Sequence, residues 1–391
     1  MSDLAADTFA NFDPSRVPSP CFVVDEVAVE RNLKVLQRVQ QESGAKVLLA
    51  LKAFSMFSLA PLVMRYLSGT CASGLLEATL GREEYGGEVH VYSAAYTPGD
   101  LEEVLKIADH VVFNTLSQWQ RFQLLVQAAK QQRPQLDFGL RINPLHSEGA
   151  VALYDPCAPG SRLGTPISQI LDQDLSGFSG LHFHTLCEQN FAPLSRTLDA
   201  VEAQAGHLLS KMKWINFGGG HHISHPSYDV DGLIARIKAF REKYGVQVYL
   251  EPGEAIAIRS GVLVSEVLDL MRNGSDIAIL DTSATCHMPD TLEMPYRAHI
   301  FGSGEPDALP HTYRLGGLSC LAGDVMGDYS FARPLQVGQR LVFDDMAHYT
   351  MVKTTTFNGV RLPALALWNS QTNSLRIVRE FGYQDFRNRL S

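Results

Sequence analysis

The chain has 391 residues, 45% of them hydrophobic and 19% charged, so it is long enough for two or three domains and can bury a large core. Its formal net charge of -9 argues against a protein that binds a nucleic-acid backbone, and lysine and arginine form no clustered run. We therefore expect a globular protein that does not bind nucleic acid.

The first residues, MSDLAADTFANFDPSR, carry neither the basic region nor the apolar stretch of a signal peptide. No segment elsewhere offers about 20 apolar residues in a row for a membrane span. The six cysteines show no CxxC or comparable metal-binding spacing, which predicts free thiols and no metal site. A cytoplasmic protein without a membrane partner is the expectation.

Short apolar runs rich in β-branched residues alternate with amphipathic stretches from about Lys46 onward, a pattern typical of repeated βα units. Helical patterns lie between the runs, for example at 117–132 and 192–212. Eight βα repeats in roughly 200 residues predict a TIM-type (β/α)8 barrel. The eight runs are 46–53, 69–74, 88–95, 110–115, 137–144, 180–186, 214–220 and 247–254.

After Glu254 the pattern changes to strand-like segments broken by Gly, Pro and Asp, which predicts a second, mostly β domain. An early apolar run, CFVVDE, is surplus to the eight barrel strands, so we expect it to join that β domain. The predicted organisation is an N-terminal segment (1–26) that joins the β domain, a barrel (27–254) and a C-terminal β domain (255–391). The β domain would then be discontinuous in sequence.

Polar residues follow the predicted barrel strands at the end where TIM-barrel enzymes build their active sites. Each one alone has an ordinary explanation, such as a snorkelling lysine or a glycine-rich turn. Together at one barrel mouth they predict a functional site. These residues are Lys52, Ser73, Arg141, His184, Gly218, Gly219, Gly220 and Glu251.

The stretch NFGGGHH (216–222) places bare backbone N–H groups after a strand, where they can bind a phosphate or form an ordinary tight turn. A lysine, a phosphate-binding loop and a carboxylate on one rim suggest pyridoxal 5'-phosphate, with Lys52 forming the Schiff base. Glu251 would pair with the pyridine nitrogen and keep it protonated, which favours decarboxylation over racemisation. The residues alone thus predict a pyridoxal-phosphate barrel enzyme, with decarboxylation favoured.

Several longer motifs follow one another along nearly the whole chain. They are LLALKAFS (48–55), GLHFHTLCEQN (180–190), NFGGGHHI (216–223), YLEPGEA (249–255), LDTSATCHMPD (280–290) and GGLSCLAGDVMGDY (316–329). In this order they resemble the fold-type III pyridoxal-phosphate decarboxylases, the alanine racemase-fold group that includes the ornithine and diaminopimelate decarboxylases. Within that group the chain is most similar to the carboxynorspermidine decarboxylase branch.

The resemblance implies a role for each residue at the cofactor ring. Lys52 matches the lysine that forms the Schiff base, and His184 matches the histidine that stacks on the ring. Arg141 matches an arginine near the ring hydroxyl, and Glu251 matches the partner of the ring nitrogen.

The resemblance also implies phosphate contacts and a shared site. Gly218, Gly219 and Gly220 match phosphate contacts together with Tyr349 of MAHYTM (346–351). Cys320 of SCLAGD matches a cysteine that reaches the site from the neighbouring subunit and protonates the carbanion. The expected smallest active unit is therefore a homodimer.

Three positions depart from the pattern of the group. Glu254 stands where relatives often carry the arginine of EPGR, Leu321 follows Cys320 where the ornithine and diaminopimelate enzymes have an acid, and Thr70 replaces an acid of some relatives. We expect Glu254 near the substrate and Asp324 as the acid that binds its distal amine. The departures favour a longer polyamine over ornithine, lysine or arginine.

The segment CHMPDTLEMPYR (286–297) is the expected substrate end of the site. His287 and Asp290 would bind amines, and Tyr296 with Arg297 would bind the departing carboxylate. An irregular connector with a surface ion pair explains the same residues equally well.

The function that the resemblance implies is decarboxylation of carboxynorspermidine, and of carboxyspermidine, to norspermidine or spermidine in polyamine biosynthesis. These substrates differ by one methylene, which a pocket discriminates by only about 1–3 kcal/mol, so the sequence does not rank them. The alternatives are a diaminopimelate-type or other amino-acid decarboxylase, a non-catalytic pyridoxal-phosphate carrier and an inactive regulatory paralogue.

Overall fold

The structure, a computed structural model, describes residues 8–149 and 152–391. The chain divides into two compact units, Arg31–Ile256 and a second unit that joins the described residues up to Glu30 with Ala257–Ser391. It passes between them within helices α2 (Glu26–Ser43) and α10 (Glu254–Ala257). The boundaries predicted after residues 26 and 254 lie at the first residues of these two helices.

Eight parallel strands close into a barrel within the first unit, which confirms the predicted fold. Each strand pairs with its neighbours, and the pairing of β5 with β6 closes the ring. Every strand ends before its predicted run does, so the polar residues that follow lie in turns at one rim. The strands are β2 (Lys46–Ala50), β3 (Gly69–Ala72), β4 (Glu88–Tyr92), β5 (His110–Phe113), β6 (Asp137–Asn143), β8 (Gly180–His182), β9 (Trp214–Asn216) and β10 (Gln247–Leu250).

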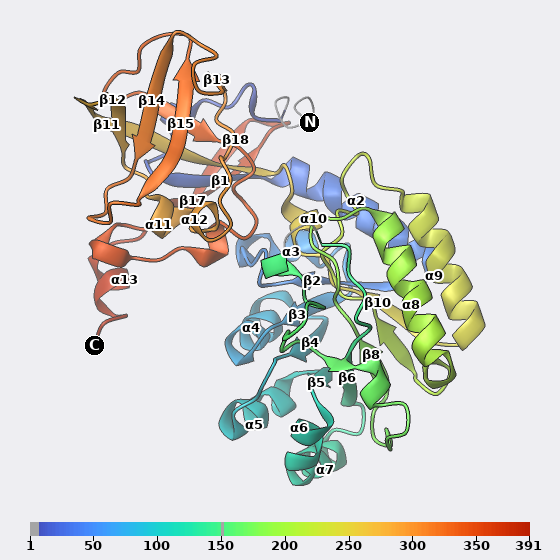
Figure 1. Cartoon of the computed structure of the whole chain (residues 1–391). Coiled ribbons are helices and arrows are strands. Elements are labelled where there is room, and N and C mark those ends of the chain that lie inside the picture. Colours follow the sequence, from blue (N-terminus) through green and yellow to red (C-terminus); the bar gives the residue numbers. More distant parts are fainter. Residues whose placement is uncertain (1–7, 150–151) are drawn as a thin grey trace. The chain divides into compact units, whose positions relative to one another are not determined.

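Helices lie outside the ring of strands (Figure 1). Their ends follow from local sequence: Thr97 caps α5 by accepting from the Asp100 N–H (3.1 Å), and Gly245 ends α9 in the left-handed conformation. Besides α2 and α10, they are α3 (Ala60–Val63), α4 (Leu75–Leu80), α5 (Pro98–Ile107), α6 (Leu116–Arg121), α7 (Gln123–Gln132), α8 (Phe191–Leu209) and α9 (Val230–Tyr244).

Two features of the barrel differ from the sequence expectation. The helix predicted over 117–132 is interrupted at Phe122, whose backbone (φ -105°, ψ 14°) leaves the helical region, and so becomes α6 and α7. Between β6 and β8 the described residues form no α-helix, but short 3-10 turns and a two-residue strand, β7 (Thr165–Pro166), which pairs with β6.

Side chains in the interior of the barrel pack around Trp214. Gly139, Gly180 and Trp214 lie side by side on β6, β8 and β9, and the indole ring occupies the space in front of both glycines. A Cβ atom on Gly180 would lie 2.1 Å from the indole. Leu48, Val112 and Tyr249 complete this buried cluster, which fills the barrel as a packed core.

Polar residues also lie at the amino-terminal ends of the strands, opposite the rim described above. The rings of His90 and His110 stack with centroids 3.9 Å apart, and Trp214 stacks on His110 at 4.7 Å. Burial lowers the pKa of His110 to about 2, so this imidazole is neutral at physiological pH. Glu88 pairs with Lys46 and lies 3.0 Å from His90, which satisfies its carboxylate.

The second unit is a mixed sheet, and the early run predicted to join it does so. Strand β1 pairs antiparallel with β11 and parallel with β17, and in Figure 1 it is the blue strand among the orange and red ones. The strands are β1 (Cys21–Asp25), β11 (Gly261–Asn273), β12 (Ser275–Leu280), β13 (Ser303–Gly304), β14 (His311–Gly316), β15 (Val325–Phe331), β16 (Arg340–Phe343), β17 (Ala364–Asn369) and β18 (Ser374–Arg379). Its helices are α11 (Ala284–His287), α12 (Asp290–Glu293) and α13 (Tyr383–Arg387).

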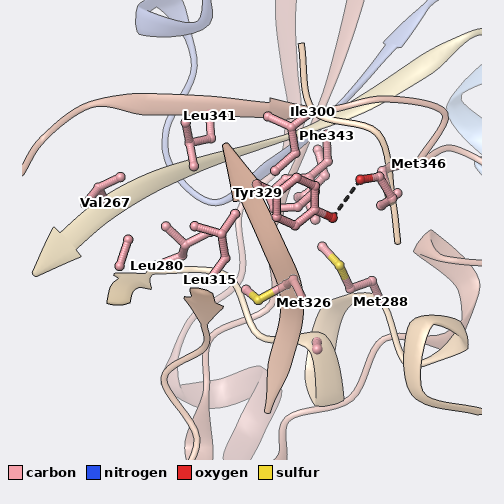
Figure 2. Close-up of a cluster of buried hydrophobic side chains, with 14 of the residues drawn as sticks. Val267, Leu280, Met288, Ile300, Leu315, Met326, Tyr329, Leu341, Phe343 and Met346 are labelled. Carbon is pink, nitrogen blue, oxygen red and sulfur yellow. Dashed lines mark hydrogen bonds between the residues drawn. The ribbon is translucent and has the colours of Figure 1, made fainter. Parts of the chain in front are cut away.

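One apolar core of this unit surrounds Tyr329 (Figure 2). The Tyr329 ring is fully buried, and its hydroxyl donates to the Ala298 carbonyl at 2.6 Å, so the phenol loses no hydrogen bond on burial. Met288, Met326 and Phe343 pack in the same cluster. Among the described residues of the whole chain, no helix combines the length and apolar character needed to cross a bilayer.

The close packing of Trp214 against Gly180 predicts that one added methyl group at Gly180 destabilises the barrel. Gly180→Ala should lower the free energy of unfolding by about 1–3 kcal/mol or more, because the indole and the strand backbone cannot both stay in place. Gly99→Ala is the matched control, since the added Cβ meets no atom within 4 Å apart from its chain neighbours and the backbone of its own helix. Urea unfolding of both variants measures the effect, and equal stability of Gly180→Ala and the parent chain would contradict the packing described.

Candidate active site

A pocket opens at the carboxyl-terminal rim of the barrel. The space among its lining residues, open solvent included, is about 410 Å³. Six of the eight strands contribute to it, so it depends on barrel closure rather than on one loop. The lining residues are Ala50, Lys52, Cys71, Ala72, Ser73, Tyr92, Arg141, His182, His184 and Glu251.

Lys52 lies two residues beyond the end of β2, in a turn rather than in the strand. The backbone holds this turn in place, because the Leu51 N–H donates to the Cys71 carbonyl on β3 (3.1 Å) and the Ala53 N–H donates to the Ala50 carbonyl (3.1 Å). Lys52 as a whole residue is exposed to solvent, whereas its ammonium end lies among other groups of the pocket. Desolvation by these groups lowers the pKa of the ammonium, and the charge of Arg141 lowers it further, although Cys71 and Glu251 oppose the shift.

Arg141 is buried at the end of β6, with 5% of its surface exposed. Its guanidinium lies over the Tyr92 ring, 4.4 Å from the centroid, and Nη2 donates to the His184 carbonyl at 3.3 Å. The Tyr92 hydroxyl donates to Asn114 Oδ1 at 2.7 Å, which fixes the ring beneath the cation. The pocket therefore holds a positive charge whose position is set by an aromatic face.

His184 is fixed by the glycine loop. Its Nδ1 accepts from the Gly219 N–H at 3.0 Å, and burial together with the charges of Lys52 and Arg141 holds the pKa of the ring well below its ordinary value. The imidazole is therefore neutral, with its proton on Nε2. A neutral, oriented ring in the pocket wall fits the predicted stacking role.

The three glycines pack against backbone. Gly218 and Gly220 have φ of +71° and +82°, and a Cβ on Gly219 would lie 2.1 Å from the Glu251 carbonyl oxygen. The Gly218 N–H donates to Asn216 Oδ1 at 2.8 Å, and the Gly219 N–H is bound to His184. The loop thus positions His184 and Glu251, while its predicted contacts with a phosphate stay a prediction.

Glu251 directly follows β10 and is ionised. Its Oε1 accepts from Asn216 Nδ2 at 2.7 Å, and Oε2 lies 3.3 Å from His182 Nε2. Burial raises the pKa of this carboxyl, but His182, His90 and Asn216 outweigh burial and bring the pKa to about 2. A carboxylate so stabilised suits the predicted partner of a protonated ring nitrogen.

Two further predicted residues of the barrel lie at or beside this rim. Ser73 lines the pocket at the end of β3, and its N–H donates to Glu77 Oε2 at 2.6 Å. Glu254 begins α10 with its carboxylate 3.2 Å from His222 Nε2, so the acid that stands at the expected arginine position is paired with a histidine.

The remaining predicted residues belong to the second unit. Cys320 is exposed in a loop between β14 and β15, and its N–H donates to Asn358 Oδ1 at 2.7 Å. Tyr349 is half-buried with a left-handed backbone (φ 49°). Asp324 is 4% exposed and accepts from Ser283 Oγ (2.9 Å) and from the Ser319 N–H (3.0 Å). This carboxylate ties the Cys320 loop to the start of α11, and the structure does not support its predicted contact with a substrate amine.

The four predicted substrate-binding residues of segment 286–297 differ in their burial and in their partners within the chain. His287 is fully buried; its Nδ1 accepts from the Ser283 N–H (3.2 Å) and its Nε2 lies 2.9 Å from the Arg361 carbonyl oxygen. Both ring nitrogens are therefore used within the chain, and the structure does not support substrate binding by His287.

The other three predicted residues are Asp290, Tyr296 and Arg297, and they differ in their contacts and exposure. Asp290 is ion-paired with Lys353, and Arg297 lies over the Tyr329 ring at 4.7 Å and pairs with Glu305. Tyr296 is 43% exposed. Substrate contacts by Asp290, Tyr296 and Arg297 stay predictions.

Four residues of the site were not predicted from the sequence: Cys71, Tyr92, His182 and Asn216. The alternation of strand side chains is the signal that identifies two of them. Within the predicted runs 180–186 and 69–74, His182 precedes His184 by two residues and Cys71 precedes Ser73 by two, so alternation predicts the same face for both members of each pair.

Comparisons with known proteins identify the family of the chain. A family model described as pyridoxal-dependent decarboxylase, C-terminal sheet domain, matches residues 21–347. The chain is 44% identical to a carboxyaminopropylagmatine decarboxylase from Synechocystis sp. over 100% of both chains. It is 43% identical to a carboxynorspermidine/carboxyspermidine decarboxylase from Campylobacter jejuni, with 95% of this chain and 98% of that one covered. The crystal structure of carboxynorspermidine decarboxylase complexed with norspermidine from Campylobacter jejuni has a TM-score of 0.87 to this chain at 41% identity, covering 95% and 100% of the two chains. The chain therefore belongs to the family of pyridoxal-dependent decarboxylases.

Proposed function

We propose that this enzyme uses pyridoxal 5'-phosphate to decarboxylate carboxynorspermidine and carboxyspermidine. The convergence of Lys52, Arg141, His184 and Glu251 in one pocket carries the proposal, together with full-length relatives of that activity. When bound, the cofactor supplies an aldehyde that an amine can attack and a ring that withdraws electrons from the substrate.

The residues present fit this cofactor. An amine attacks a carbonyl only in its neutral form, and the lowered pKa of Lys52 makes that form accessible. Glu251 stays ionised and can hold a protonated ring nitrogen, while the neutral imidazole of His184 offers a flat face to a ring. Arg141 adds a fixed positive charge for the ring hydroxyl.

We propose that the glycine loop and Tyr349 contact the phosphate and that Ser73 contacts the cofactor. Ser73 lines the pocket, which supports its share of this binding. Glu254 cannot hold a phosphate as the arginine of relatives would, because a carboxylate repels it. Its pairing with His222 supports a structural role beside the glycine loop.

Cys320 is proposed to return a proton to the carbon atom that loses CO2, from the second subunit of a homodimer. Its exposure supports this role, because a donor to another subunit must lie at the surface. The hydrogen bond from its N–H to Asn358 and the hydrogen bonds of Asp324 hold its loop in a defined conformation.

A second candidate substrate is carboxyaminopropylagmatine, a carboxylated amine that ends in a guanidinium group. It is favoured by the Synechocystis relative, which is named for carboxyaminopropylagmatine and aligns with the whole of this chain. Diaminopimelate and ornithine are disfavoured, since the relatives named for those activities are 23–25% identical.

A panel of five acids tests the substrate class. CO2 release from carboxynorspermidine and carboxyspermidine should exceed release from diaminopimelate and ornithine by at least about 100-fold, and carboxyaminopropylagmatine shows whether a guanidinium is accepted. Lys52→Ala should abolish turnover and the visible absorbance of the bound cofactor. Turnover of diaminopimelate alone would contradict the substrate proposal, and a Lys52→Ala variant that keeps both signals would contradict the assignment of the lysine.

Mixing equal amounts of two impaired variants tests the shared site. Cys320→Ala should bind cofactor normally yet turn over slowly, because it lacks only the proton donor. When it is mixed with Lys52→Ala and the subunits exchange, about a quarter of parental activity should appear, since half of the dimers then hold one intact site. No recovery in a mixture whose exchange is verified by mass would argue that each site is built from a single chain.

A further inference from the structure

His182 is a buried histidine of the pocket for which the proposed function leaves no role. It is the last residue of β8, 2% of its surface is exposed, and it lines the pocket beside Glu251. Its Nδ1 makes no hydrogen bond with any residue that the structure describes. A polar ring so placed calls for an explanation beyond packing.

The two oxygens of Glu251 are held differently. Oε1 accepts from Asn216 Nδ2 at 2.7 Å, and the orientation of that amide is set because its Oδ1 accepts from the Gly218 N–H at 2.8 Å. Oε2 faces His182 Nε2 at 3.3 Å, within ion-pair distance but without the angle of an aligned hydrogen bond. Asn216 therefore anchors one oxygen, and His182 faces the other.

Charge favours one arrangement of protons here. Burial lowers the pKa of His182, and the positive charges of Arg141 and Lys52 lower it further, whereas Glu251 opposes the shift. Cys71 on β3 also borders Glu251, and burial keeps that thiol protonated by raising its pKa. In either charge state of the imidazole, the nitrogen that faces the carboxylate, here Nε2, carries a proton.

We propose that His182 is a positioning residue: with Asn216, it orients the Glu251 carboxylate toward the ring nitrogen of the bound cofactor. This inference rests on the proposed function. An oriented carboxylate should raise the pKa of the ring nitrogen, because it stabilises the protonated form better than a carboxylate that can turn away.

The test follows protonation of the ring nitrogen directly. Holoenzyme is loaded with pyridoxal phosphate carrying 15N in the ring, and its NMR shift is recorded against pH. In the parent enzyme the nitrogen should stay protonated across neutral pH. His182→Leu should move its deprotonation to lower pH and lower kcat by about 10- to 100-fold with little change in KM, the size of effect typical of residues that orient a ligand of a reactive centre.

Two variants separate positioning from packing. His182→Gln keeps an N–H donor and should recover most of the shift and of kcat. If His182→Leu fails to fold, His182→Phe, which keeps a ring without an N–H, takes its place and should show the same losses. His110→Leu removes another buried histidine at the opposite end of the barrel and should affect stability without moving the 15N titration.

The possible failures are distinguishable. A parental titration and parental kcat in His182→Leu, with normal cofactor binding, would overturn the role of His182 and leave the proposed function intact. Absence of cofactor binding by the parent chain would overturn both.

Discussion

The pairing of β5 with β6 is the interaction on which the site depends, because it closes eight parallel strands into a ring. Closure places all eight carboxyl-terminal ends on one rim, and side chains far apart in sequence then share a pocket. Lys52 and Glu251 are about as far apart as the barrel sequence allows, yet β2 and β10 are neighbours in the ring. The interior below must be filled for the ring to hold its shape, and Trp214 does so by lying against two glycines.

The pocket combines buried charges that perturb one another. Arg141 keeps its place over Tyr92, and Glu251 is stabilised by Asn216 and His182, so both are anchored. None of the described residues anchors Lys52 in this way, and desolvation of its ammonium disfavours the charge. The site thus stabilises the charged form of Glu251 and destabilises the charged form of Lys52. A site that combines a permanent carboxylate with an amine nucleophile requires this difference.

Much of this arrangement was predictable from the sequence, because eight apolar runs that alternate with helical patterns leave few alternatives to a barrel. Lys52, Arg141, His184 and Glu251 followed from the rule that the rim is functional. The sequence could not show that His287 and Asp324 are buried, because burial depends on strands that pair only in three dimensions. Nor could it show that two glycine N–H groups are already bonded, or that His182 and Asn216 both contact Glu251.

We propose that Lys52 is the amine to which the cofactor binds. Borohydride reduction of the pyridoxal-phosphate-loaded enzyme fixes the cofactor on that amine, and mass spectrometry of the digested protein locates it. We expect a single stoichiometric label on the peptide that contains Lys52. A label on another lysine, with Lys52 unmodified, would contradict it.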